Sequence, residues 1–114
     1  MSKNNRVQLI GNVGNEPDVR YHDSGKVSCA FSLATNNAYR DKDGVLQKET
    51  IWHNVTCWDS YAKAIEEKVH KGTRMFIEGS LKYNDWTDRA GTRHNTAYVS
   101  MMEFEIIGTG SNNN

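Results

Sequence analysis

Three tryptophans are the side chains of this sequence best suited to recognition chemistry. Trp52 and Trp58 belong to one alternating stretch, and Trp86 follows another, polar one. In a strand, residues of one parity share a face, so Trp52 and Trp58 would share theirs with Asn54 and Thr56. Flat rings on a mixed polar face can stack on nucleobases, because every base offers a flat π-face. The competing interpretation is ordinary packing, since aromatic residues favour strands in any case.

The opposite face of the same stretch carries the residues expected in the core. These residues are Ile51, His53, Val55 and Cys57.

The cysteines, histidines and acidic residues of the sequence do not form an arrangement suited to catalysis or to metal binding. Cys29 and Cys57 fall in separate strand-like stretches and are expected to be buried, reduced thiols. The histidines show no metal-ligand spacing. The neighbouring acidic residues are the pairs Asp41/Asp43, Glu66/Glu67 and Asp85/Asp88. Each pair is typical of solvated charge, so we expect no enzyme activity, no metal and no cofactor.

The length and the charge of the chain limit which classes of protein it can belong to. The chain of 114 residues suffices for one domain with a single core. Its 14 basic residues balance 14 acidic ones, so any contact with phosphates would depend on local basic stripes. No apolar run approaches a membrane span, and residues 1–5 lack the apolar segment of a signal peptide. These features predict a soluble, cytoplasmic protein.

Alternation and turn signals divide the first half of the chain into strands. The first strand spans residues 6–13 and ends before the only proline, Pro17. A short extended piece at 19–21 is followed by strands at 26–38 and 50–58. Residues 39–49 between them are charged and polar, with a turn at Asp43-Gly44.

The second half is predicted to hold the one helix and two further strands. The helix runs from Ser60 to His70, with Asp59 as its N-cap and Gly72 near its end. Strands follow at 74–82 and 96–107, joined by a loop at 83–95. Residues 108–114 contain too little apolar surface to fold and are expected to be a short disordered tail.

Three strands, a helix and two strands is the element order of a five-stranded Greek-key barrel of the oligonucleotide-binding (OB) type. We therefore predict an all-β OB-fold domain over residues 1–107. The helix between the third and fourth strands would close one end of the barrel. The loops between strands would flank a ligand groove.

Four motifs in the same order resemble the bacterial-type single-stranded DNA-binding proteins. They are residues 11–14 with 17–21, residues 50–53 with Trp58, residues 71–72 with 76–81, and residues 86–88. The resemblance covers residues 6–107. It implies a non-enzymatic protein that binds and protects single-stranded DNA during replication, recombination and repair, without sequence preference.

The resemblance also implies roles for single residues. The stacking positions are Trp52, Trp58, Trp86 and Tyr39. The basic positions along the phosphate path are Arg20, Lys71 and Lys82. His53 matches a histidine near the subunit interface of a homotetramer; the alternative is a core histidine with a local hydrogen bond. The segments 36–49 and 83–95 would be mobile loops that fold over the bound strand.

The sequence departs from the family pattern in two respects. Asn54, Asn84, Asp85 and His94 stand where relatives often place arginine or lysine, which predicts weaker affinity and a shallow salt dependence. The printed sequence also ends at Asn114 without the linker and acidic tip that recruit replication and repair proteins. Those partners are expected only for a form that carries such a tip.

A second hypothesis is a primosomal or other accessory protein of the same fold, whose aromatic face serves mainly protein partners. The near-zero net charge favours this hypothesis slightly. The complete set of three tryptophans and the length of the helix favour DNA binding.

Overall fold

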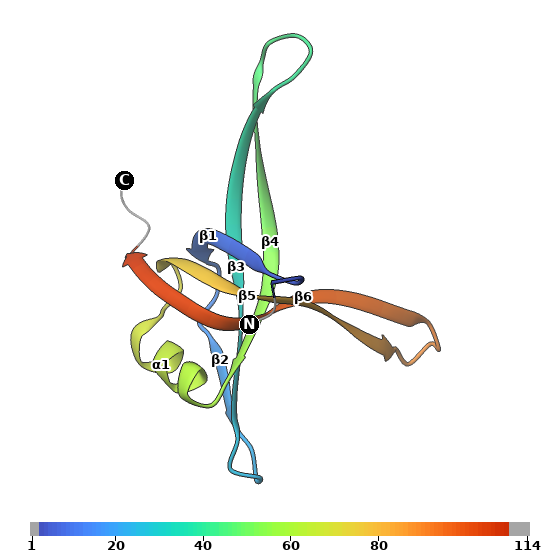
Figure 1. Ribbon diagram of the computed structural model, residues 1–114. Helices are drawn as coiled ribbons and strands as arrows, with labels where there is room; N and C mark the ends of the chain where they lie inside the picture. The colour runs from blue at the N-terminus through green and yellow to red at the C-terminus, as the bar shows by residue number, and fades with distance from the viewer. Residues whose placement is uncertain (1–2, 110–114) are drawn as a thin grey trace.

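Alternating apolar residues organise the chain into six strands and one helix over residues 3–109, the part that this computed structural model describes (Figure 1). The elements are β1 (Val7–Val13), β2 (Asp18–Tyr21), β3 (Val27–Arg40), β4 (Leu46–Trp58), α1 (Ser60–Lys68), β5 (Arg74–Thr87) and β6 (Arg93–Gly108). The expected tail residues 110–114 lie outside the described part. Gly108, also assigned to the tail, instead ends β6.

The strands close into a barrel. The sheet order is β1-β5-β6-β4-β3-β2, and β1 also pairs with β3 at Asn12 and Val13. Five strands therefore form the barrel, while β2 extends β3 beyond the closure. This arrangement confirms the predicted five-stranded OB fold. The short piece predicted at 19–21 is β2, so the helix follows the third barrel strand but the fourth strand of the chain.

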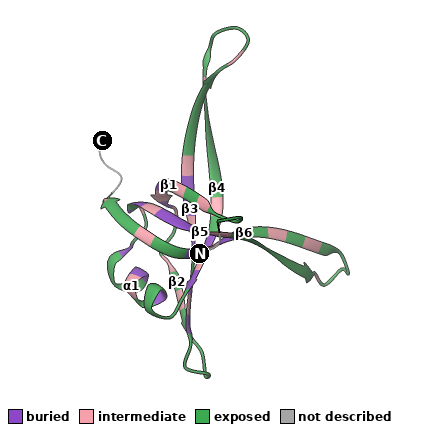
Figure 2. Cartoon of the chain, in the orientation of Figure 1, coloured by how far each residue is buried: buried purple, intermediate pink, exposed green. Residues whose placement is uncertain are grey.

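One face of each barrel strand fills the core, as the sequence alternation predicted. Figure 2 shows the buried residues gathered where the strands and α1 meet. The core side chains are Val13, Val27, Cys29, Phe31, Leu33, Val55, Cys57, Ala62, Ile65, Val69, Met75, Ile77, Val99 and Met101. Both cysteines are buried thiols, as expected. Leu81 was expected on the core face of its strand, but it lies partly exposed beyond a register shift at Glu78/Gly79.

The helix packs Ala62 and Ile65 against the barrel, but its ends differ from the prediction. Asp59 precedes the helix with a φ of 54° and makes no side-chain cap. Its carboxylate instead accepts a hydrogen bond from the Val27 N–H at 3.2 Å, so it fastens the helix start to β3. The helix ends at Lys68, two residues earlier than expected. Gly72, with a φ of 94°, lies in the turn that leads to β5.

The prediction of loops at residues 36–49 and 83–95 is wrong, because most of these residues continue the flanking strands. β3 and β4 stay paired as far as Arg40 and Leu46, and β5 and β6 as far as Thr87 and Arg93. Figure 1 shows the two resulting hairpin arms projecting from the barrel in different directions. Backbone hydrogen bonds hold these polar segments together without any core.

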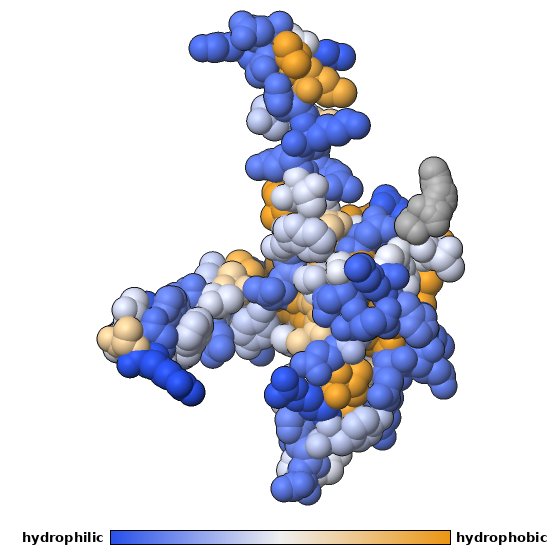
Figure 3. All heavy atoms as spheres, turned by 180° about the vertical axis from the view of Figure 1, so that it is seen from behind, coloured by the Kyte–Doolittle hydropathy of each residue, from blue (hydrophilic) through white to orange (hydrophobic). Residues whose placement is uncertain are grey.

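The turn at each arm tip is fixed by one aspartate. Asp41 Oδ1 accepts the N–H groups of Asp43 and Val45, and Asp88 Oδ1 accepts those of Ala90 and Thr92. Such Asx interactions favour a tight turn, which explains why the turns themselves were predictable. Figure 3 shows mainly hydrophilic side chains over both arms, with an apolar group near the tip of the β3–β4 arm.

Within residues 3–109, no helix is long and apolar enough to cross a membrane. The same part of the chain contains no group of three or more His, Cys, Asp or Glu residues placed to hold a metal ion.

Two glycines allow the close strand crossings that the barrel needs. A Cβ on Gly11 would overlap the carbonyl group of Ala34, where β1 meets β3. A Cβ on Gly79 would overlap the carbonyl group of Ser100 beside the register shift in β5 and β6. The obstacles are backbone atoms, which cannot rotate away.

We therefore expect Gly11→Ala and Gly79→Ala each to lower the free energy of unfolding by about 1–3 kcal/mol, the usual cost of overpacking. Urea unfolding would measure the loss. Ala90→Ser in the exposed turn is the control and should change stability by less than about 0.5 kcal/mol. A wild-type unfolding midpoint for both glycine variants would contradict this account of closure.

Candidate nucleic-acid interface

The polar and aromatic face of β4 lies beside the matching face of β3. The cross-strand pairs on this face are Ser28 with Trp58, Ala30 with Thr56, Ser32 with Asn54, and Ala34 with Trp52. Trp52 is 61% exposed and Trp58 is 47% exposed, whereas Val55 and Cys57 between them are buried. The predicted outer face of β4 is therefore confirmed, as are the core positions Val55 and Cys57. Ile51 was also expected in the core, but it is 37% exposed where β4 enters the β3–β4 arm.

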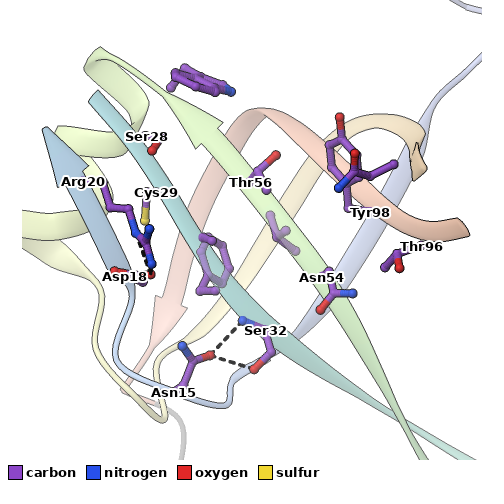
Figure 4. Close-up of a pocket in the computed structure, with 15 residues that line it drawn as sticks. Asn15, Asp18, Arg20, Ser28, Cys29, Ser32, Asn54, Thr56, Thr96 and Tyr98 are labelled. Carbon is purple, nitrogen blue, oxygen red and sulfur yellow. Dashed lines mark hydrogen bonds and ion pairs between the residues drawn. The ribbon is translucent and has the colours of Figure 1, made fainter. Parts of the chain in front are cut away.

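This face forms the floor of a groove of about 760 Å³. Figure 4 shows β2 with Asp18 and Arg20 along one side, and Thr96 and Tyr98 along the other. Asn54 and Thr56 from β4 lie between them. Asn15 stands at one end, where its Oδ1 accepts hydrogen bonds from the N–H and the hydroxyl of Ser32, at 2.8 and 2.7 Å. Five segments of the chain thus converge on one hollow, at residues 15–20, 28–32, 54–58, 84 and 96–98.

The groove is almost uncharged. Amide and hydroxyl groups are set among apolar surface in its lining, and Asp18 and Arg20 are the charged residues among those that line it. Arg20 Nη2 lies 3.1 Å from Asp18 Oδ2, so these two charges compensate each other. The groove can therefore offer hydrogen bonds and ring faces, but little net attraction for phosphate groups.

Trp52 lies against the backbone of the β1–β2 connection. A Cβ built on Gly14 would overlap the six-membered ring of this tryptophan. The Gly14 N–H donates to the Ser32 carbonyl at 2.9 Å, which fixes the connection over β3. Gly14 thus supports one side of the exposed ring.

Trp58 has a histidine as its neighbour. The rings of His22 and Trp58 are 5.8 Å apart between centroids, at an interplanar angle of 29°. His22 Nε2 lies 2.8 Å from the Ser28 hydroxyl, directly across the strand pair from Trp58.

Trp86 extends the same face along the β5–β6 arm. The register pairs Lys82 with Tyr98, Asn84 with Thr96, and Trp86 with His94. Tyr98, Asn84 and Thr96 line the groove, so Trp86 continues its face outward along the arm, while Lys82 shares the face nearer the barrel. The Trp86 indole N–H donates to Thr96 Oγ1 at 3.2 Å, and the ring is 47% exposed.

Two of the predicted residues lie away from this face. Tyr39 has the core-side parity of β3, so it projects from the opposite side of the β3–β4 arm to Trp52. Lys71 lies exposed in the turn before β5, where its N–H donates to Glu16 at 2.9 Å. This hydrogen bond, followed by that from His70, lowers the pKa of Glu16. The roles of Tyr39 and Lys71 stay predictions.

His53 lies on the core-side face of β4, half-buried. Its Nε2 is 2.9 Å from the Thr35 hydroxyl, and burial lowers the pKa of the imidazole. This is the local hydrogen bond that the alternative interpretation of His53 expected. Its role at a subunit interface stays a prediction.

The sequence analysis did not identify Asn15 and Tyr98 as groove residues, or His22 as the neighbour of Trp58. All three come from segments that only the tertiary structure brings beside β4. The one signal in the sequence is the parity of Tyr98, which shares its face with Thr96 and His94.

Comparison with known proteins gives a consistent result. The profile described as "Single-strand binding protein family" matches residues 4–107. The chain is 35% identical to "Single-stranded DNA-binding protein 1" of Xylella fastidiosa strain 9a5c, over 100% of this chain and 85% of the relative. It is 33% identical to the "Single-stranded DNA-binding protein" of Xanthomonas axonopodis pv. citri strain 306, over 91% of this chain but only 58% of that relative.

Two solved structures share the fold. The structure described as "Plasmodium falciparum SSB complex with ssDNA" has a TM-score of 0.86 and 28% identity, covering 94% of this chain and 97% of that one. A deletion mutant of the single-stranded DNA binding protein from Thermus aquaticus has a TM-score of 0.79 and 26% identity, covering 90% of this chain and 50% of that one.

The contact between Trp52 and Gly14 leads to a test on the free protein. In Gly14→Ala the new methyl group must displace the Trp52 ring, while the backbone can stay in place because the obstacle is a side chain. We expect a shifted emission maximum from a variant that retains Trp52 as its sole tryptophan. Unfolding should change by no more than about 1 kcal/mol, since the ring is exposed. Unchanged emission would contradict the contact.

Proposed function

The chain belongs to the single-strand binding protein family, and on this premise we propose that it coats single-stranded DNA without sequence preference. It is a DNA-binding protein of the OB fold and not an enzyme. The observation that carries the proposal is the set of three exposed tryptophans along one polar groove and its adjoining arm.

Stacking is the main source of binding energy in this proposal. Trp52, Trp58 and Trp86 each present a flat ring to solvent, and a base stacked on such a ring contributes about 1–3 kcal/mol. Stacking does not depend on base identity, which accounts for binding without sequence preference. The amides and hydroxyls between the rings would bond to sugars and base edges.

Electrostatic attraction to phosphate groups contributes less to the proposed binding than stacking does. Arg20 is already paired with Asp18, and Lys82 and Lys71 are the further basic residues proposed to lie along the strand. Each contact between a cation and a phosphate releases counterions, so few contacts mean a shallow salt dependence. The two arms would lengthen the binding surface, with Tyr39 on the β3–β4 arm as a further stacking residue.

We further propose that the protein assembles as a homotetramer. Support comes from β1, which pairs with β3 only at Asn12 and Val13 and so leaves an edge of residues 7–11 available. Ile10 on this strand is 51% exposed. Exposed strand edges and apolar side chains favour association with another copy. His53 is proposed to lie near a subunit contact.

The proposed setting is DNA replication, recombination and repair on the bacterial nucleoid in the cytoplasm. Contacts with replication and repair proteins are proposed only for a form that carries an acidic C-terminal tip.

The proposal is tested by titrating oligo-dT while recording tryptophan fluorescence. We expect strong quenching that saturates at a fixed ratio of nucleotide to protein. Alanine at Trp52, Trp58 or Trp86 should each weaken binding by about 1–3 kcal/mol. Tyr83→Ala is a matched control, because Tyr83 is exposed on the opposite face of the β5–β6 arm from Trp86. Absence of quenching would favour the accessory-protein hypothesis.

Salt dependence gives a separate prediction. Three cation–phosphate contacts at about 0.7 each give a slope of log affinity against log salt no steeper than about −2. Repeating the titration over a range of sodium chloride concentrations measures this slope. A much steeper slope would show that basic residues outside this set hold the strand.

His53 gives a prediction about assembly. Burial disfavours the charged imidazole, and burial by a partner subunit would oppose its protonation further. Between about pH 8 and about pH 5.5, the tetramer should therefore weaken only below about 6.5, the ordinary histidine pKa, because burial has already lowered the pKa of His53 in the single subunit. Sedimentation velocity measures the mass. His53→Gln cannot be protonated and should remove the pH effect. An identical mass at both pH values in the wild type would argue against an interfacial His53.

A further inference from the structure

The indole of Trp86 is held from one side by a histidine. The ring centroids of Trp86 and His94 are 4.2 Å apart, and the planes differ by only 17°. The indole N–H is fixed by its hydrogen bond to Thr96. Trp86 therefore has one covered face, one anchored edge and an otherwise exposed ring.

His94 is in turn held by the arm tip. Its Nε2 lies 2.9 Å from Asp88 Oδ2, while Asp88 Oδ1 accepts the N–H groups of Ala90 and Thr92. The hydrogen bond from His94, followed by that from Thr92, lowers the pKa of Asp88. The carboxylate is thus ionised at neutral pH and can accept a hydrogen bond from the imidazole. A continuous series of contacts therefore connects the turn to Asp88, Asp88 to His94, and His94 to the indole.

The other two tryptophans lack this arrangement. The His22 ring is farther from Trp58 and more inclined, and its partner is the neutral Ser28 hydroxyl. Trp52 rests on the Gly14 backbone. Within residues 3–109, Trp86 is therefore the one of the three whose ring is covered by a histidine that contacts a carboxylate.

We propose that His94 and Asp88 are positioning residues for strand binding, which hold Trp86 as a one-sided stacking platform. The inference rests on the proposed function, since it assumes that a base stacks on the open face of Trp86. A ring that is already fixed loses less side-chain freedom when a base binds.

The surrounding charges leave Asp88 as the acidic partner of His94. Asp85 points to the other face of the arm, where its carboxylate accepts a hydrogen bond from Asn95. Arg93 has the parity of that other face, and Arg89 lies in the turn. Lys82 shares the face of His94 but lies nearer the barrel. Asp88 is therefore the acidic group in contact with His94, and the nearby basic residues lie to either side.

The test compares the oligo-dT affinity of the wild type with that of matched variants. His94→Ala should lower affinity about twofold to tenfold, the range for losing one aromatic pair. His94→Phe keeps a flat ring and should restore affinity. Asp88→Asn should keep the turn but lose part of the affinity. Asn95→Ala, on the next residue and the opposite face, should bind as the wild type does.

The emission of Trp86 separates positioning from a purely structural role. In a Trp52→Phe, Trp58→Phe background, this emission should change in His94→Ala, because the imidazole no longer covers one face of the indole. His94→Phe should keep that face covered. The emission is measured without DNA and reports the ring contact directly.

Three results would overturn the inference. Unchanged affinity in His94→Ala would show that the histidine does not position the ring. Tighter binding in His94→Ala would show that His94 competes with a base for the same face of the indole. Absence of wild-type binding would overturn the proposed function, and this inference with it.

Discussion

The unbroken antiparallel pairing of β3 with β4 is the constraint on which the rest of the structure depends. The register is constant from Ser28 opposite Trp58 to Arg40 opposite Leu46, without a bulge. A shift of one residue would exchange the two faces, because side chains alternate strictly along a strand. The same register places Val55 and Cys57 in the core and Trp52 and Trp58 outside. Core, groove floor and one arm are therefore set by a single ladder of hydrogen bonds.

The neutral groove explains how a chain without net charge can belong to a DNA-binding family. Asp18 compensates Arg20, and amides occupy positions such as Asn54 and Asn84 where a more basic protein would carry cations. In the binding mode that we propose, the binding energy comes mainly from ring faces and hydrogen bonds. These contacts form only at close approach, so the proposed binding is less sensitive to salt than binding through many cations.

The arms show how polar sequence can still be ordered. Neither arm has a core, and each is closed by an aspartate that accepts two backbone N–H groups at the tip. On the β5–β6 arm this aspartate also contacts His94, which covers Trp86. The residue that fixes the turn is thus connected through His94 to an exposed tryptophan.

The sequence by itself determined the barrel, the helix position, the core alternation and the three exposed tryptophans. These features follow from local periodicity and turn chemistry, which depend only on residues close together in the sequence. Tertiary structure alone decided that polar residues 39–40, 46–49 and 83–87 continue as strands, since two solvated faces leave no hydrophobic pattern to read. It alone placed Tyr39 opposite Trp52, brought Asn15 and Tyr98 to the groove, and set His22 beside Trp58. Those positions depend on closure between distant strands, which no local pattern specifies.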